Sequence, residues 1–176
     1  MINFFKKTYT KKELKLFEFL SQVKLFSNLT EEELVLFVPH IHERQYKQNE
    51  VVFLRDDPSQ ALYILKEGLV TLNIEVNNKF EKLTTVEGVV CMGESCLLKN
   101  TRRLLNAIVA SDTADFYVIP QYNILTIFEN NLEIKVKMME ALAVIHNDYN
   151  RRLFKAYKTA YGFFDMSSIY GETKDM

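Results

Sequence analysis

Several features that mark specialised classes of protein are scarce in this 176-residue sequence. Its two cysteines, Cys91 and Cys96, are too few for a disulfide framework, so we expect a reducing, cytoplasmic environment. No apolar run approaches the length of a membrane-spanning helix, and residues 1–7 do not have the form of a secretory signal. The 22 Lys and Arg residues nearly balance the 23 Asp and Glu residues. Because phosphate contacts need an excess of positive charge, this balance argues against a dedicated nucleic-acid-binding protein.

The composition is otherwise that of an ordinary globular domain, with 48% hydrophobic and 26% charged residues. A chain of this length can bury roughly 70% of its unfolded surface, so it needs neither disulfides nor metal to fold. We find no Ser/His/Asp arrangement, pair of catalytic carboxylates, P-loop or metal-ligand spacing. The sequence therefore predicts a protein that is not an enzyme and holds no cofactor or metal.

The local patterns predict helices at both ends and strands between them. Two Thr-x-x-Glu capping boxes, at residues 10–13 and 30–33, predict the starts of two short helices. From residue 41 to residue 120, short apolar and β-branched runs alternate regularly with turn signals, as in an antiparallel sandwich or barrel. Asn77 and Asn78 predict a tight hairpin, because Asn tolerates positive φ. The predicted strands are residues 51–54, 62–65, 69–76, 80–86, 107–110 and 116–119.

After Pro120 the apolar period becomes helical, which predicts a short helix over residues 121–129 and a long one over 132–157. This long helix carries a continuous apolar stripe that packs either on its own barrel or on a second copy of the chain. Its length favours a homodimer. The stripe consists of Ile134, Met138, Leu142, Ile145, Tyr149 and Leu153.

Residues 88–98 are the most informative for chemistry. Gly93 and Glu94 open a short helix inside the predicted barrel, where a turn exposes backbone N–H groups that suit a phosphate. The Glu94 carboxylate only accepts hydrogen bonds, so it suits the hydroxyls of a ribose. Arg103, nine residues after Glu94, carries a planar fork that can bind the same phosphate through two hydrogen bonds.

Most of the chain resembles the cyclic nucleotide-binding domain family. The resemblance rests on the order and spacing of four segments, residues 25–29, 52–58, 62–68 and 92–98. This family includes the effector domain of Crp/Fnr-type regulators. The resemblance implies a mainly β fold, an antiparallel jelly-roll β-barrel with N-terminal helices and a long C-terminal helix. It divides the chain into a helical extension (1–24), the barrel (25–131), the long helix (132–160) and a flexible tail (161–176).

The resemblance also implies a phosphate-binding cassette that runs from Gly93 to about Ala107. Glu94 would contact the ribose 2′-hydroxyl, an Arg would neutralise the cyclic phosphate, and the long helix would lie over the ligand. The implied function is a regulatory sensor that binds cAMP, cGMP or a related small anion and signals through the long helix. The candidate ligand-binding residues are Gly93, Glu94, Ser95, Cys96, Arg102 and Arg103.

Three departures from the family pattern bear on this function. Asn49 and Asp56 replace glycines at two turns, and both residue types tolerate the left-handed conformation. The family's spacing, counted forward from Glu94, places its Arg at Arg103. Counted back from the following strand, it falls on Leu104 instead. A one-residue bulge would explain the difference between the two counts. Leu104 also stands where the family has a small residue, and we expect its apolar side chain to fill the pocket.

Two other hypotheses compete with the regulatory sensor, the first suggested by Leu104 and the second by the family resemblance. In the first hypothesis, the domain is a ligand-free scaffold for dimerisation or protein interaction, in which Leu104 fills the cassette. Alternatively it is part of a Crp/Fnr-like transcription regulator, which we disfavour because the residues after Tyr157 contain no helix-turn-helix pattern. In each case Cys91 and Cys96 are interpreted as core thiols. Because we disfavour the transcription regulator, we expect neither nucleic acid nor membrane as a partner.

Overall fold

The computed structural model of the chain describes residues 8–77 and 79–162. It forms two compact units, Met1–Ala141 and Leu142–Met176, with the boundary inside the last helix. Most of the predicted tail, from residue 163 onward, lies outside the described residues. So does Asn78 of the predicted hairpin, whereas its neighbour Asn77 has the expected positive φ of 51°.

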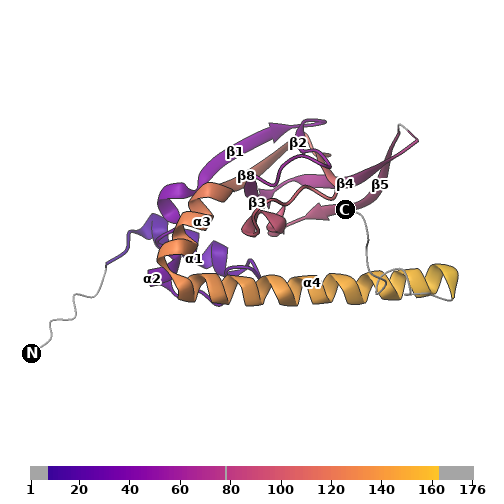
Figure 1. Ribbon diagram of the computed structural model, residues 1–176. Coiled ribbons are helices and arrows are strands. Elements are labelled where there is room, and N and C mark those ends of the chain that lie inside the picture. The colour runs from indigo at the N-terminus through magenta and orange to yellow at the C-terminus, as the bar shows by residue number, and fades with distance from the viewer. Residues whose placement is uncertain (1–7, 78, 163–176) are drawn as a thin grey trace, which may run out of the picture. The chain divides into compact units, whose positions relative to one another are not determined.

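The described residues of the first unit form two four-stranded antiparallel sheets (Figure 1). Sheet A has the order β1 (His42–Lys47), β8 (Thr113–Pro120), β3 (Ala61–Glu67) and β6 (Val90–Met92). Sheet B has the order β2 (Val51–Phe53), β7 (Asn106–Val109), β4 (Leu69–Val76) and β5 (Lys79–Glu87). Neighbouring strands are mostly not consecutive in the chain, as in a jelly roll. The predicted mainly β, antiparallel jelly-roll fold is confirmed, although the sheets stay open instead of closing into a barrel.

The main core is built from side chains of both sheets. In β4, Val70 and Leu72 pack into this core, so the alternation of a strand places Thr71 and Asn73 on the opposite face of sheet B. Burial of these apolar side chains is the main favourable contribution to folding. The buried members are Val52, Leu65, Val70, Met92, Ala107, Val109, Ala114 and Phe116.

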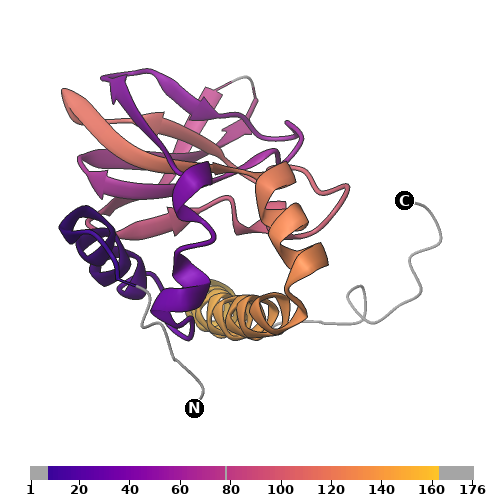
Figure 2. The same cartoon turned by 90° about the vertical axis from the view of Figure 1, so that its left-hand side faces the viewer.

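The N-terminal helices α1 (Lys11–Ser21) and α2 (Glu31–Leu34) begin at the two predicted capping boxes. In each, the N-cap Thr side chain accepts a hydrogen bond from the N3 backbone, and the N3 Glu carboxylate accepts one from the N-cap backbone. A 3₁₀ turn, η1 (Val38–His40), then leads into β1. After β8 the chain continues into α3 (Gln121–Asn130), which lies with α1 and α2 at one end of the sheets (Figure 2).

The long helix α4 (Leu132–Tyr161) follows α3 and carries the predicted apolar stripe. At its start Ile134 and Met138 are 2% and 0% exposed. Further along, within the second unit, Tyr149 and Leu153 are 51% and 66% exposed. No helix in the described ranges is long and apolar enough to cross a membrane.

Glu33 joins α2 to the start of α4. Its two carboxylate oxygens accept hydrogen bonds from Lys137 Nζ at 2.8 and 3.0 Å, and one of them also accepts from the Thr30 backbone at 2.8 Å. Burial by itself would raise the pKa of Glu33, but the hydrogen bonds from Lys137 and Thr30 outweigh burial and lower the pKa. A carboxylate whose pKa is lower in the folded state stabilises the fold above its unfolded-state pKa. This contribution is lost as the pH falls through the folded-state value.

We therefore expect Glu33→Gln to destabilise the protein at neutral pH, and the difference from wild type to vanish in acid. Urea unfolding at a series of pH values measures this difference. Glu31→Gln, in the same first turn but exposed, is the matched control and should show a smaller effect. Equal pH profiles for the two variants would assign the effect to the helix dipole instead of to the contact with Lys137.

Candidate functional site

A left-handed turn at Gly93 joins β6 to the short 3₁₀ helix η2 (Glu94–Leu97). Gly93 has φ 77° and ψ 32°, a conformation that glycine adopts without strain. The position also requires a small residue, because a Cβ built on Gly93 would overlap Arg103 Nη1. The turn therefore depends on glycine for two independent reasons, and it brings the cassette backbone against the guanidinium of Arg103.

Arg103 is the most buried charged residue at the site, with 4% of its surface exposed. Its Nη1 donates to Gly93 O at 3.1 Å and its Nη2 donates to Ala61 O at 2.6 Å. The guanidinium carbon lies 4.5 Å from the ring centre of Phe53 and 5.6 Å from that of Tyr63. Both rings present a face that attracts a cation. Burial lowers the pKa of Arg103, because removal from water disfavours the charged form.

One donor of Arg103 is unused: Nε is buried and has no hydrogen-bond partner among the described residues. Nor does Arg103 form an ion pair with any carboxylate in that part of the chain. Backbone carbonyls and aromatic faces compensate a buried guanidinium only partly, since they carry no full negative charge. The carboxylates of Glu94 and Asp57 act on Arg103 electrostatically, but neither forms an ion pair with it among the described residues.

Backbone hydrogen bonds of the loop hold Arg103 so that its side chain is buried, whereas the side chains of Arg102 and Leu104 are exposed. Arg103 N donates to Asp57 O and Asp56 N donates to Arg103 O, each at 2.9 Å. Arg102 pairs with Pro58 in an isolated bridge, is exposed, and donates from Nη1 to Asp56 O at 2.5 Å. The expectation that Leu104 fills the pocket is wrong, because its side chain is 80% exposed. Leu104 lies in a bend between this bridge and β7, so the strand register does not carry it inward.

Three residues that sequence reasoning missed fix the cassette to its surroundings. The hydroxyls of Ser59 and Ser95 are 2.7 Å apart, and Thr101 Oγ1 donates to Ser95 O at 2.7 Å. Gln121 Nε2, at the start of α3, donates to Cys96 O at 2.8 Å and to Leu98 O at 2.9 Å. Ser59 follows a segment that carries the family resemblance, residues 52–58, but no sequence pattern indicated the roles of Thr101 or Gln121.

The remaining predicted residues lie in or beside η2. Glu94 is half-buried at its first position and Cys96 is fully buried within it. Burial raises the pKa of the Cys96 thiol to about 12, although the charge of Arg103 opposes this. Cys91, in β6, also has its pKa raised by burial. Both thiols are free and stay protonated at neutral pH, as expected for core cysteines.

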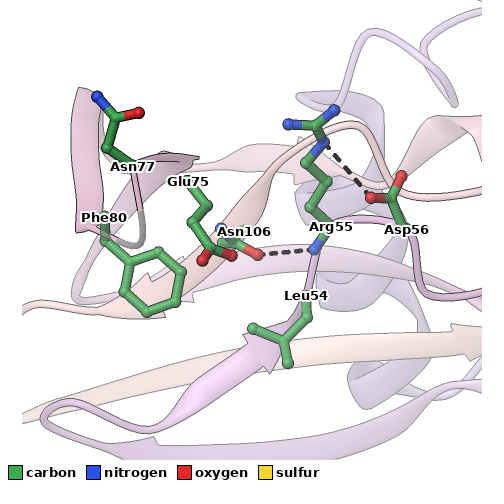
Figure 3. A pocket seen from close by; sticks show the side chains of 7 residues that line it. All are labelled: Leu54, Arg55, Asp56, Glu75, Asn77, Phe80 and Asn106. Atoms are coloured by element: carbon green, nitrogen blue, oxygen red, sulfur yellow. Dashed lines mark hydrogen bonds and ion pairs between the residues drawn. The ribbon is translucent and has the colours of Figure 1, made fainter.

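The structure thus brings Gly93, Glu94, Ser95, Cys96 and Arg103 to one place, with Arg102 on the outside of the loop. No group of three or more His, Cys, Asp or Glu residues in the described ranges is placed to hold a metal ion. A separate hollow of about 430 Å³ opens beside Asn106 and the β4–β5 hairpin (Figure 3).

Comparison with known proteins gives a family match. The model of the cyclic nucleotide-binding domain family matches residues 43–131. A curated relative from Rhodopseudomonas palustris, named as a potassium channel protein, is 31% identical over 84 residues, which are 48% of this chain and 20% of the relative. This chain therefore spans a fifth of the length of that relative.

Two solved structures illustrate the likeness in fold. The regulatory domain of Toxoplasma gondii PKA, crystallised with cAMP, has a TM-score of 0.61 and 20% identity, over 69% of this chain and 46% of that one. The Thermus thermophilus catabolite activator protein has a TM-score of 0.62 and 22% identity, over 76% of this chain and 62% of that one. At such identities the likeness shows the fold alone, so function has to be argued from the site.

Proposed function

The chain belongs to the cyclic nucleotide-binding domain family, and we propose that it binds cAMP, cGMP or a related small anion beside Arg103 and signals through α4. Its action is then regulatory and not enzymatic. The observation that carries this proposal is the buried guanidinium of Arg103, which has an unused Nε and no carboxylate partner in the described residues. A cyclic phosphate would supply the missing negative charge and accept the free hydrogen bond.

The surroundings of Arg103 fit the rest of a nucleotide. Glu94 begins η2 directly after Gly93 and is half-buried, and its carboxylate, which only accepts hydrogen bonds, would suit ribose hydroxyls. Leu104 points away from the interior, which removes the apolar obstacle expected at the phosphate position. The aromatic rings of Phe53 and Tyr63 that now flank the guanidinium would also suit a base.

A route for signalling begins at Gln121. This residue holds the carbonyls of Cys96 and Leu98 in the cassette, and it is also the first residue of α3, which leads into α4. A ligand that shifts η2 would therefore shift the start of α3. Such a shift changes the position of α4 only if the ligand binds the two arrangements with different affinity. The exposed apolar residues of α4 in the second unit, such as Leu153, would then pair with a second copy or another partner.

A ligand-free scaffold is the second candidate, and one observation favours it. Both terminal nitrogens of Arg103 already donate to backbone carbonyls, those of Gly93 and Ala61. In that case the guanidinium acts as an internal clamp between the cassette and β3, and the domain works through its surface.

Calorimetry with cAMP and cGMP separates the two candidates. We expect binding by wild type, a loss of roughly a hundredfold in affinity for Arg103→Ala, and little change for the exposed control Arg102→Ala. Circular dichroism verifies that each variant is folded. If folded wild type gives no heat with either nucleotide at millimolar concentration, the nucleotide proposal is wrong and the scaffold is favoured.

A further inference from the structure

Strand pairing gathers a second group of polar side chains on the face of sheet B that points away from the core. Asn106 of β7 pairs with Asn73 of β4, and Glu75 of β4 pairs with Phe80 of β5. Asn73 and Glu75 are two residues apart, so they share a face. This face lies opposite that of Leu72, which packs into the core. The group is therefore on the other side of sheet B from the core and from the rings that flank Arg103.

Glu75, Phe80 and Asn106 line the hollow of about 430 Å³, a size that suits a small molecule or a single side chain with its backbone. Figure 3 shows Arg55 and Asp56 on one side of it and Phe80 with Asn77 on the other, with Glu75 and Asn106 between them. Leu54 completes the lining. The walls come from the β2–β3 loop and from the β4–β5 hairpin, two segments distant in sequence.

The hollow contains a buried donor that the fold does not use. Asn106 is 3% exposed, and its Oδ1 accepts a hydrogen bond from Arg55 N at 2.7 Å. That bond orients the amide and leaves Nδ2 without a partner among the described residues. A buried N–H group without a partner is unfavourable, so a carbonyl or carboxylate oxygen that reached it would be bound favourably. Glu75 and Phe80, which line the hollow together with Asn106, are both exposed to solvent.

The charges around the hollow favour a cation. Arg55 Nε lies 3.6 Å from Asp56 Oδ2, so these two charges compensate each other. Glu75 has no ion-pair partner in the described residues. The half-exposed ring of Phe80 is its direct cross-strand neighbour. A carboxylate next to an aromatic face attracts organic cations. A metal ion fits poorly, because the amide nitrogen is a donor and not a ligand.

We propose that this hollow is a binding site for an arginine or lysine residue, either as the free amino acid or within a peptide. The cation lies between Glu75 and the ring of Phe80, and the ligand's carbonyl or carboxylate oxygen accepts the hydrogen bond from Asn106 Nδ2. This site is independent of the proposed nucleotide site, and neither requires the other.

The test is calorimetry on the full chain with two probes, free L-arginine and Nα-acetyl-L-arginine methylamide. The first represents the free amino acid and the second a residue within a peptide. L-Citrulline, which has nearly the same shape but no charge, is the control ligand. We expect Glu75→Gln to weaken binding by about tenfold and Phe80→Leu by about threefold.

Glu81→Gln is the matched control variant. It removes the same charge from the same hairpin, but Glu81 pairs with Ile74 and therefore lies on the opposite face from Glu75 and Phe80. Unchanged affinity in this variant supports the site, and whichever probe binds identifies the source of the ligand. The proposal is overturned if neither probe binds, if citrulline binds as well as arginine, or if Glu81→Gln weakens binding as much as Glu75→Gln.

Discussion

Gly93→Ala should destabilise the protein by about 3 kcal/mol, and Arg103 should leave its place between Gly93 O and Ala61 O. Part of this cost is backbone strain, because Gly93 has φ 77° and alanine resists the left-handed region. The larger part arises because the new methyl group would overlap Arg103 Nη1. The guanidinium is the end of a flexible side chain and can move, but in moving it loses both charge-assisted hydrogen bonds.

Gly88→Ala is the matched control, since Gly88 has a similar φ of 72° but no atom within 4 Å of an added Cβ. It should cost about 1 kcal/mol, the strain alone. Urea unfolding of Gly93→Ala in an Arg103→Ala background then isolates the clash, because the extra cost should vanish when the guanidinium is absent. If the extra cost persists in that background, the close approach to Arg103 is not its cause.

Phe116→Ala is expected to have an even larger effect, a loss of about 4 kcal/mol in the free energy of unfolding. Phe116 is 0% exposed in the core between the sheets. Its ring makes edge contacts with Tyr46 and Tyr63, with ring centres 5.4 and 6.2 Å apart. Because Tyr63 in turn flanks Arg103, the cavity should also weaken ligand binding at the proposed nucleotide site.

Phe80→Ala makes the same chemical change on the surface, where the side chain is 56% exposed, and should alter stability by no more than about 0.5 kcal/mol. Urea or thermal unfolding compares the two variants directly. A loss below about 2 kcal/mol for Phe116→Ala would contradict the tight packing described for this core.

Much of the fold could be predicted because its signals are local. The capping boxes at Thr10 and Thr30, the positive φ at Asn49 and Asp56, and the limits of β4 all agree with the sequence patterns. The strands β1 and β6 were not predicted. β1 is mostly exposed and has no apolar alternation, and β6 has only three residues, so neither carries a period that a pattern can detect.

The candidate site was predicted in its residue types but not in its geometry. The order of Gly93, Glu94 and Arg103 along the chain indicated an anion site, and these residues do lie together. Counting could not decide between Arg103 and Leu104, since the two counts disagree by one residue. That choice depends on the hydrogen bonds of the loop with Asp56 and Asp57, which come from a segment distant in sequence.

The sequence by itself determined the elements whose causes are neighbours along the chain: the helix starts, the left-handed turns and the alternation of the longer strands. The tertiary structure alone decided which side chains enter the interior. Arg103 is buried and Leu104 is exposed. Two strands distant in sequence surround the guanidinium: β3 supplies Ala61 O as a hydrogen-bond acceptor and the ring of Tyr63, and β2 supplies the ring of Phe53. The scarcity of cysteine and of net charge gave only expectations about the class of protein, and the position of one guanidinium required the folded chain.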